Sequence, residues 1–590
     1  MESAAPEATP TTPPAGKKAK KAKPDWPTQV ADRVLRRTAG GDRPDERVVC
    51  ASGISPSGPV HLGNLRELLV PHFVAEEIKR RGIDCEHLLS WDDYDRLRKV
   101  PAGIDPSFEE YVGMPLTAVP DPEGELGSWA ERFKAPVVEA MAAIGVDLRY
   151  ISQTEMYASG AYREQIITAI ERRQDIDQVL GRFRTLDAPS AGEDGDGDGD
   201  ETVLADSGAE DADDVAEDDG AEYWPYKVYC QICGYDSTSM TSAEREDDAY
   251  WIAYQCFRCG FEGRFNLLEE NHGKLVWKVD WPMRWAYESV TFEPGGADHS
   301  SPGSSFTVGS ELVDKIFDGQ APEYEAYSFV GMHGMGKMSS SAGAVPTPLD
   351  ALAVVEPAML RWMYVRKTPR QAIKIDFGPG IYALYDEWDT LNAKVTSGDA
   401  APGQVMTHGR ATRSTIANGF EQPAAIVPFR TLTSAVSVAA GDDTQTARII
   451  GQLTDVPAER AGDAEPRLSA ARTWLDRYAP PEERITVRTE PDIERLAALS
   501  DTERRWLELL LASLEDDWSL EGARSLVYGV PKVAAGLPLD TPPTPELKTE
   551  QREFFKLLYQ LFLGAETGPR MPTLLMALGP ERVRALLPTG

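Results

Sequence analysis

One stretch near the N-terminus alternates strand, turn, helix and strand, and this order constrains the fold more than any other feature of the sequence. Residues 48–51 are apolar and predict a short buried strand. The stretch "GISPSGPVHLGN" (residues 53–64) is rich in the glycine and proline that mark turns. Apolar residues then recur at helical spacing up to Ile78, and "CEHLLSW" (residues 85–91) predicts a second strand. Such a βαβ unit predicts a parallel, doubly wound sheet.

The turn between this strand and helix has the composition of an anion site. Backbone N–H groups in a glycine-containing turn and the positive end of the helix dipole both favour an anion. His61 and Asn64 lie three residues apart, on one side of the first helical turn, and both can donate to phosphate oxygens. On these residues alone, a phosphate site and a plain capped turn remain equally favoured.

A second stretch, "GKMSSSAG", combines a cation with hydroxyl groups between glycines. Lys337 is followed by Met338 and by three serines, Ser339, Ser340 and Ser341. A loop of this kind can hold a polyphosphate while charge develops on it. Taken alone, it also fits an exposed serine-rich surface loop.

Four of the six cysteines form two Cys-x-x-Cys pairs with 22 residues between them. Cys230 and Cys233 form the first pair, and Cys256 and Cys259 form the second, each followed by a glycine. Four thiolates at this spacing predict a closed, tetrahedral, structural zinc site, and the spacer predicts a hairpin. A redox role would need only one pair. Cys50 and Cys85 are expected to be small core residues in strands.

Charge and composition narrow the functional classes. The formal net charge of −34 argues against indiscriminate nucleic-acid binding, which depends on a positive field. About 15 acidic residues lie between Thr185 and Tyr226 without any Lys or Arg, which predicts a disordered acidic insertion. No apolar run approaches the length of a membrane helix, and the N-terminus lacks a signal-peptide core. We therefore expect a cytoplasmic protein that binds no membrane.

The sequence divides into six expected regions: a basic arm and lead-in (1–45), the first half of a catalytic sheet domain (46–185), the acidic insertion (186–222), a zinc-binding module (223–270), the second half of the sheet domain (271–345) and a helical region (346–590). Within the second half, residues 274–285 predict a strand that runs into a turn. Residues 324–332 predict one further strand.

Together, the motifs resemble a known family. "PSGPVHLGN" and "KMSSS" resemble the two signatures of class I aminoacyl-tRNA synthetases, His-Ile-Gly-His and Lys-Met-Ser-Lys-Ser, in the same order. Asn64 replaces the last histidine, and Ser340 replaces the second lysine. With "SWDDYDRLRKVP", "VDWPMRW" and the C-terminal "FFKLLYQLFLGAETGPRMPTLLMALG", the variants look like class I lysyl-tRNA synthetases from about Arg47 onwards.

The resemblance implies a fold and a reaction. The fold would be a Rossmann-like α/β catalytic domain with an inserted zinc module, followed by an all-α anticodon-binding region. The reaction would join L-lysine to tRNA(Lys) through a lysyl-adenylate, with ATP, Mg²⁺ and structural Zn²⁺ as cofactors. A monomer is the working expectation, and the residues that read the anticodon are not identified.

The resemblance also implies site residues. The catalytic residues would be His61, Asn64 and Lys337. The ATP-binding residues would be Ser55, Pro56, Gly58, His61, Gly63, Asn64, Lys337, Met338, Ser339, Ser340 and Ser341. The lysine pocket would hold Gly53, Ser55, Asp92, Asp93, Tyr94, Trp281, Asp298, His299 and Tyr327, and Asp95 belongs to the same acidic stretch. Each pocket residue also has a plain structural interpretation as a capping aspartate or a core aromatic.

Three alternative functions remain. A class I synthetase for another amino acid, such as glutamate, would also fit "VDWPMRW". A nucleotidylyltransferase would share the phosphate motif but would not need the helical region or the zinc module. A non-catalytic RNA-binding or regulatory relative could keep the fold. The acidic pocket candidates favour a cationic substrate, which is why lysine is preferred.

Overall fold

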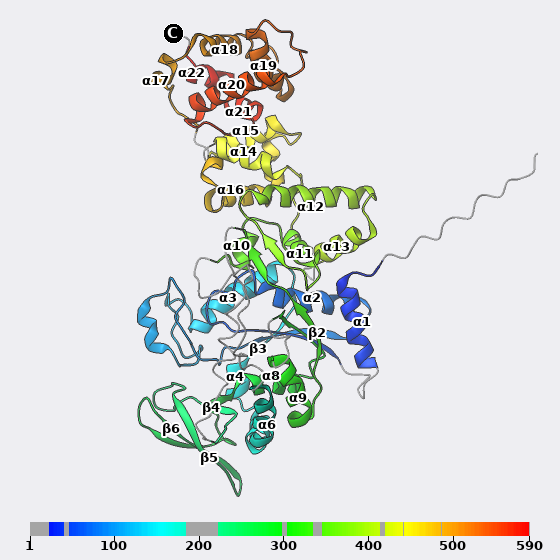
Figure 1. Cartoon of the computed structure of the whole chain (residues 1–590), viewed down its shortest axis with the longest axis vertical. Coiled ribbons are helices and arrows are strands. Elements are labelled where there is room, and N and C mark those ends of the chain that lie inside the picture. Colours follow the sequence, from blue (N-terminus) through cyan, green and yellow to red (C-terminus); the bar gives the residue numbers. More distant parts are fainter. Residues whose placement is uncertain are drawn as a thin grey trace, which may run out of the picture.

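A five-stranded parallel sheet organises the N-terminal half of the chain, in the strand order β10-β9-β1-β2-β3 (Figure 1). The computed structural model describes residues 23–39, 47–184, 222–297, 304–333, 345–413, 419–439, 442–484 and 487–588. The strands are β1 (Val48–Ile54), β2 (Cys85–Trp91), β3 (Arg149–Ser152), β9 (Phe292–Gly296) and β10 (Glu323–Tyr327). Strands β1 and β2 pair in parallel from Val48–Cys85 to Ile54–Trp91, with α2 (Leu65–Arg80) between them in the sequence. The predicted βαβ unit is confirmed.

Helices cover both faces of this sheet. On one face, α1 (Trp26–Ala39) and α2 pack against Val48 and Cys50. On the other, α8 (Trp277–Tyr287) and α9 (Ser305–Phe317) pack against Val49 and Ala51. Successive residues of β1 therefore face opposite layers, because side chains alternate along a strand. Cys50 and Cys85 are buried in their strands, as expected.

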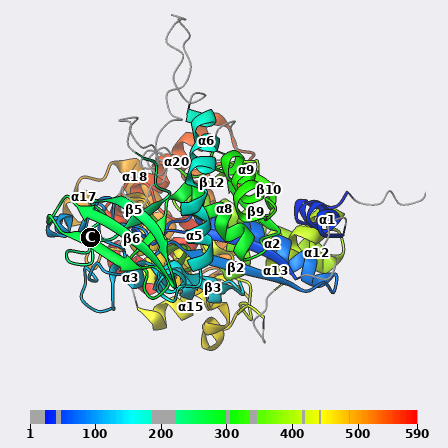
Figure 2. The same ribbon diagram turned by 90° about the horizontal axis from the view of Figure 1, so that it is seen from below.

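The segment with the paired cysteines forms small antiparallel sheets beside the large one. β4 (Tyr226–Val228) pairs with β8 (Gly273–Leu275), and a three-stranded sheet has the order β5-β6-β7. Its strands are β5 (Thr238–Glu246), β6 (Ala249–Cys256) and β7 (Glu262–Asn266). Seen from below, β5 and β6 lie on the side opposite to α1 (Figure 2). The hairpin predicted between the cysteine pairs is confirmed as β5–β6.

Shorter elements connect these sheets. A 3₁₀ helix and four α-helices precede the cysteine segment: η1 (Pro106–Tyr111), α3 (Trp129–Ala143), α4 (Gln153–Ala158), α5 (Arg163–Glu171) and α6 (Arg173–Arg184). Residues 1–22 of the expected arm and lead-in (1–45) and residues 186–221 of the expected acidic insertion (186–222) lie outside the described residues.

Two strand predictions in the second half were wrong in part. Residues 274–285 form a strand only as far as Leu275, and α8 begins at Trp277. A turn was expected after the strand, but Trp277, Trp281 and Trp285 recur every fourth residue and place three indoles on one helical face. Residues 324–332 form two strands in different sheets, because the chain leaves β10 at Tyr327 and enters β11 (Val330–Met332), which pairs with β12 (Ile373–Ile375).

The C-terminal region is helical and extends away from the sheet (Figure 1). Its α-helices are α10 (Pro348–Leu352), α11 (Pro357–Val365), α12 (Gly380–Ser397), α13 (Pro402–Thr412), α14 (Phe429–Ala439), α15 (Asp443–Leu453), α16 (Arg467–Arg477), α17 (Ile493–Ala497), α18 (Asp501–Ala512), α19 (Leu520–Ala534), α20 (Pro545–Leu563), α21 (Met571–Leu578) and α22 (Pro580–Leu586). The 3₁₀ helices η4 (Ala458–Ala464) and η5 (Pro481–Glu483) lie among them. None of the helices in the described ranges is long and apolar enough to span a membrane.

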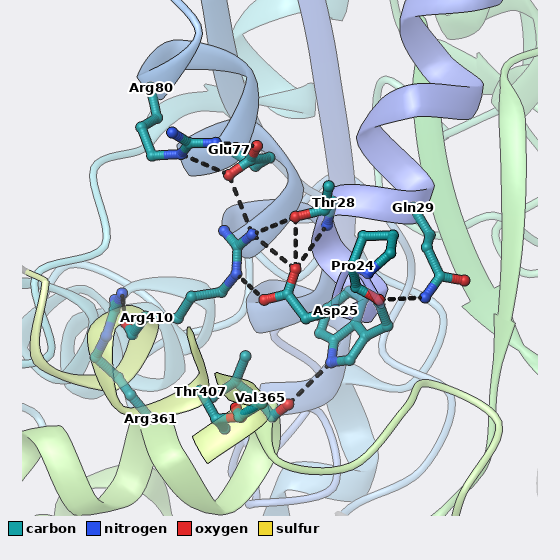
Figure 3. A network of polar contacts seen from close by, with 12 residues as sticks. Pro24, Asp25, Thr28, Gln29, Glu77, Arg80, Arg361, Val365, Thr407 and Arg410 are labelled. Carbon is teal, nitrogen blue, oxygen red and sulfur yellow. Dashed lines mark hydrogen bonds and ion pairs between the residues drawn. The ribbon is translucent and has the colours of Figure 1, made fainter. Parts of the chain in front are cut away.

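A buried network of ion pairs joins α1 and α2 to α13 (Figure 3). The guanidinium of Arg410 donates to both carboxylate oxygens of Asp25 and, at 3.0 Å, to Glu77 of α2. Arg80 and Arg81 also donate to Glu77, at 2.8 and 2.9 Å. Because Glu77 is completely buried, these donors replace the water that an exposed carboxylate would bind.

Replacing Glu77 with glutamine should destabilise the protein most near neutral pH. Burial opposes ionisation of Glu77, but hydrogen bonds from Arg80 and Arg81 and the charge of Arg410 outweigh it and lower its pKa to about 2. A carboxylate with a depressed pKa contributes stability above its unfolded-state pKa, near 4.5, and loses it as the pH falls toward 2. The melting temperature of E77Q should therefore lie several degrees below that of the wild type at pH 7, and this gap should narrow below pH 4.5.

The matched control is E139Q, which changes an exposed carboxylate of α3 that has no ion pair among the described residues. Its melting temperature should follow that of the wild type at every pH. A gap between E77Q and the wild type that stays constant as the pH falls would contradict the role given to the ionised Glu77.

Candidate active site

A cleft of about 620 Å³ opens at the carboxyl edge of the five-stranded sheet. Four strands bring residues to it: Gly53 lies near the end of β1, Asp92 directly follows β2, Gly296 ends β9 and Tyr327 ends β10. In open α/β sheets, ligands bind outside the carboxyl ends of the strands. The described part of the cysteine segment contributes one wall, which includes Lys227 and Tyr229.

The turn before α2 holds His61 and Asn64 in defined orientations. Asn64 Oδ1 accepts a hydrogen bond from the backbone N–H of His61 at 3.1 Å. The His61 Nδ1 accepts from the backbone N–H of Gly63 at 3.0 Å. A ring nitrogen that accepts is unprotonated, so a neutral His61 carries its proton on Nε2. The donor groups of these two side chains are therefore Nε2–H of His61 and the Nδ2 amide of Asn64.

Several other residues predicted to bind ATP belong to the same turn. Ser55 and Asn64 line the cleft, together with Ser57 and Val60, and His61 is buried beside them. Three further predicted residues complete the turn between β1 and α2: Pro56, Gly58 and Gly63. Of the residues predicted in this turn, Ser55 and Asn64 are therefore the ones that line the cleft.

The turn is bonded to segments that lie about 300 residues further along the chain. The backbone N–H of Leu62 donates to the carbonyl of Pro346 at 3.1 Å, and the hydroxyl of Tyr364 donates to the carbonyl of Leu62 at 2.6 Å. Pro346 comes shortly after the "GKMSSSAG" stretch. The predicted residues of that stretch lie outside the described residues: Lys337, Met338, Ser339, Ser340 and Ser341.

Arg66, in the first turn of α2, makes a second connection to the same region. Its guanidinium donates to three backbone carbonyls, at 3.1, 2.8 and 2.7 Å: those of Ser328, Gln371 and Thr368. These carbonyls flank the paired strands β11 and β12. Burial lowers the pKa of Arg66 to about 10, which still leaves the side chain charged at neutral pH. The two halves of the sheet domain thus meet at the start of α2.

The four residues that directly follow β2, Asp92 to Asp95, have different environments. Asp92 and Asp95 line the cleft. Asp93 is completely buried, where Lys134, Ser152 and the backbone N–H of Thr154 bind it, and it does not line the cleft. The ring of Tyr94 packs between two other tyrosines, 5.5 and 5.2 Å away. The structure therefore brings Asp92 and Asp95 together in the cleft. Asp93 and Tyr94 instead contact other residues of the fold.

Two cations already neutralise the cleft aspartates. Arg284 of α8 forms an ion pair with Asp92, and Lys274 of β8 forms one with Asp95. Both cations also contact Asp280, which is completely buried. Burial opposes ionisation of Asp280, but Arg284 and Lys274 outweigh it and lower its pKa. Lys274, Asp280 and Arg284 were not predicted from the sequence, although they belong to the "KLVWKVDWPMRW" segment. A correctly predicted helix would have placed Asp280 and Arg284 one turn apart.

A further buried carboxylate, Glu293 of β9, lies in the cleft and was also missed. The indole N–H groups of Trp281 and Trp285 donate to its two oxygens, at 3.1 and 2.6 Å. Burial raises the pKa of Glu293 to about 7, although both indole hydrogen bonds oppose this rise. Nothing in the stretch "FEPGG" indicates a buried carboxylate, because the two indoles that bind Glu293 come from α8.

The remaining pocket predictions have mixed outcomes. Trp281 and Tyr327 line the cleft, and the Tyr327 hydroxyl donates to Glu67 of α2. Gly53 and Ser55 line it as well. Asp298 and His299 lie outside the described residues.

The four predicted cysteines come together as a cluster that could hold a metal ion. Their Sγ atoms all lie within 4.8 Å of one another, and the pairs Cys230–Cys259 and Cys233–Cys256 are each 3.7 Å apart. A tetrahedron of sulfurs about 2.3 Å from a central ion has edges of about 3.8 Å, which this spacing matches. Gly234 and Gly260 follow the pairs with positive φ angles of 80° and 74°, so each knuckle turns where glycine permits it.

Comparisons with known proteins identify the family. The family model described as tRNA synthetases class I (K) matches residues 24–412. A lysine–tRNA ligase from Streptomyces coelicolor is 49% identical over 95% of this chain and 98% of its own length. One from Pyrococcus horikoshii is 31% identical over 94% of this chain and 97% of its own length. A solved structure of a glutamate tRNA ligase from Elizabethkingia meningosepticum is 15% identical, with a TM-score of 0.39, over 92% of this chain and 98% of that chain. The chain therefore belongs to the family of tRNA synthetases class I (K).

Proposed function

We propose that this protein joins L-lysine to tRNA(Lys) in two steps, through a lysyl-adenylate. The observation that carries the proposal is the cleft at the carboxyl edge of the sheet, where the His61–Asn64 turn lies beside acidic and aromatic residues. The relatives that match nearly the whole chain are named lysine–tRNA ligases, which supports lysine as the amino acid.

In the first step, a carboxylate oxygen of lysine attacks the α-phosphorus of ATP, and the bond from that phosphorus to the bridging oxygen of pyrophosphate breaks. The attacking carboxylate is already a nucleophile, so no strong general base is needed. Catalysis then rests on positioning and on stabilising charge. His61 donates through Nε2–H and Asn64 through Nδ2 to the phosphate oxygens, which gain negative charge in the transition state.

The "GKMSSSAG" stretch completes the ATP site in this proposal. Lys337 neutralises the leaving pyrophosphate, and Met338, Ser339, Ser340 and Ser341 contribute to binding the triphosphate. The bond between Leu62 and Pro346 supports this assignment, because it holds the end of the stretch near the His61 turn. Mg²⁺ accompanies ATP and binds its phosphate oxygens.

In the second step, a ribose hydroxyl at the 3′ end of the tRNA attacks the carbonyl carbon of the adenylate, and AMP leaves. The helical region from α10 to α22 would read the anticodon, which in a tRNA lies far from the 3′ end. Its extension away from the cleft supports this division of labour (Figure 1). The boundaries expected at residues 46, 186, 223, 271 and 346 serve as the working domain layout.

Glutamate is the nearest alternative substrate and is not favoured. A glutamate side chain would bring a further carboxylate toward Glu293, which has no cation partner among the described residues. A lysine side chain would bring the opposite charge. We also infer a cytoplasmic protein that acts as a monomer.

The cysteine cluster would hold one structural Zn²⁺. Four sulfur ligands fill the tetrahedral coordination that zinc adopts and leave no position open to water or substrate. When bound, the ion supplies a crosslink between the two knuckles. Because Asp236 and Ser237, next to the first knuckle, line the cleft, that crosslink would also fix one cleft wall.

The proposed function is tested by lysine-dependent exchange of pyrophosphate into ATP. The wild-type protein should catalyse it, and H61A and K337A should each reduce it at least about 100-fold, because each removes a donor that acts in the transition state. Both variants should keep the melting temperature of the wild type to within a few degrees.

The matched control is H272A, because His272 lies in the cysteine segment and pairs with Glu270 outside the cleft. It should retain normal exchange. Absence of lysine-dependent exchange in the wild type would refute the function. Near-normal exchange in both H61A and K337A would refute only the roles given to these residues.

Zinc analysis should find about one equivalent of metal in the purified protein. C256S removes one ligand from a four-sulfur site, so this variant should lose the metal and melt at a lower temperature. C50S, which changes a buried cysteine of β1 outside the cluster, should keep the full equivalent. A metal-free wild-type protein with an unchanged melting temperature would contradict a structural zinc.

A further inference from the structure

Glu293 differs from the other acidic residues of the cleft in its partners. Asp92 and Asp95 each form an ion pair with a cation of the chain. Among the described residues, no cation lies within ion-pair distance of Glu293, and its two oxygens receive only the neutral N–H groups of Trp281 and Trp285. A buried carboxylate usually has a charged partner, since desolvation is costly. Glu293 is therefore a cleft carboxylate whose counter-charge the described residues do not supply.

The position of Glu293 sets it at the bottom of the cleft. In the sheet, Cys50 of β1 pairs with Phe292 of β9, so Gly53 lies level with Gly295 at the rim. Glu293 comes two residues before Gly295, which places it about 7 Å below the rim along the strand. Asn64 and Ser55 also line the cleft, and Ser55 directly follows the carboxyl end of β1.

We propose that Glu293 binds the ε-ammonium group of the substrate lysine and so selects this amino acid. The inference rests on the proposed function and deepens it. The α-carboxylate of lysine has to lie at the rim, near the phosphate donors His61 and Asn64. Four methylene groups then span roughly the depth from the rim to the floor, and the ammonium reaches the carboxylate.

The surroundings of Glu293 suit a cationic side chain with an apolar stem. Trp281 lines the cleft, and its indole can cover methylene groups while its N–H fixes the carboxylate. Arg284 and Asp92 are the charged groups that act on Glu293 from α8 and from the end of β2. Because these two form an ion pair with each other, they leave the charge of Glu293 largely uncompensated. The raised pKa of Glu293, about 7, is consistent with a site that lacks one positive charge.

The test compares lysine with norleucine, which has the same four-carbon side chain but ends without the amine. The variant E293Q keeps the size of the side chain and removes its charge. In lysine-dependent pyrophosphate exchange, the KM for lysine should rise about 100-fold in E293Q, because a buried charge pair is lost. The inhibition constant of norleucine in the same assay should stay within about threefold of the wild-type value, and the KM for ATP should not change.

Two outcomes would overturn the inference. An unchanged KM for lysine would show that Glu293 does not bind the ammonium. An equal weakening of lysine and norleucine would show that the carboxylate either binds the α-ammonium or only supports the tryptophans. E293D, which keeps the charge on a shorter stem, should recover part of the affinity for lysine and leave the inhibition constant of norleucine unchanged.

The matched control is E325Q on the neighbouring strand β10. Glu325 is also buried, but it pairs with Arg33 and Arg370 and does not line the cleft. Its KM for lysine should equal that of the wild type. If the wild-type protein shows no lysine-dependent exchange, the proposed function itself is refuted. If the wild type shows exchange and E293Q has an unchanged KM for lysine, only the role of Glu293 is refuted.

Discussion

The first turn of α2 is the point on which the site depends, because it joins parts of the chain that are far apart in the sequence. The N–H of Leu62 bonds to Pro346, and the carbonyl of Leu62 accepts from Tyr364. One turn further on, Arg66 donates to three carbonyls that flank β11 and β12. These bonds are buried and charge-assisted in part, so water cannot readily replace them. They fix the turn that holds His61 and Asn64 against the segments on either side of the "GKMSSSAG" stretch.

The electrostatics of the cleft follow from which charges already have partners. Arg284 and Lys274 neutralise Asp92 and Asp95, which makes these aspartates a scaffold for the cleft wall. Glu293 has no cation partner among the described residues, and two indole N–H groups orient it without neutralising it. A substrate cation would complete this arrangement. Selectivity for lysine then comes from the cost of leaving a buried carboxylate unpaired whenever a neutral side chain enters.

The local features could be predicted from the sequence, because they depend on neighbouring residues. The βαβ unit, the His61–Asn64 turn, the hairpin and the cysteine cluster are all readable from spacing and turn residues. The helix α8 was missed because residues 274–285 were expected to form a strand that runs into a turn, whereas α8 includes Pro282.

The charge pairing of the cleft could not be predicted. Asp95 and Lys274 are 179 residues apart, and Asp92 and Arg284 are 192 residues apart, so no local pattern connects them. The same limit explains why Asp93 was grouped with its neighbours, although Lys134 and Ser152 bind it away from the cleft.

The central claim is that the protein activates lysine and transfers it to tRNA(Lys). The most direct measurement incubates the wild-type protein with ATP, Mg²⁺, tRNA(Lys) and each of the twenty amino acids in turn, and counts the amino acid bound to tRNA. The account predicts that lysine alone is transferred, with release of one AMP and one pyrophosphate for each lysyl-tRNA formed. Transfer of glutamate in place of lysine, or binding of tRNA without transfer of any amino acid, would contradict it.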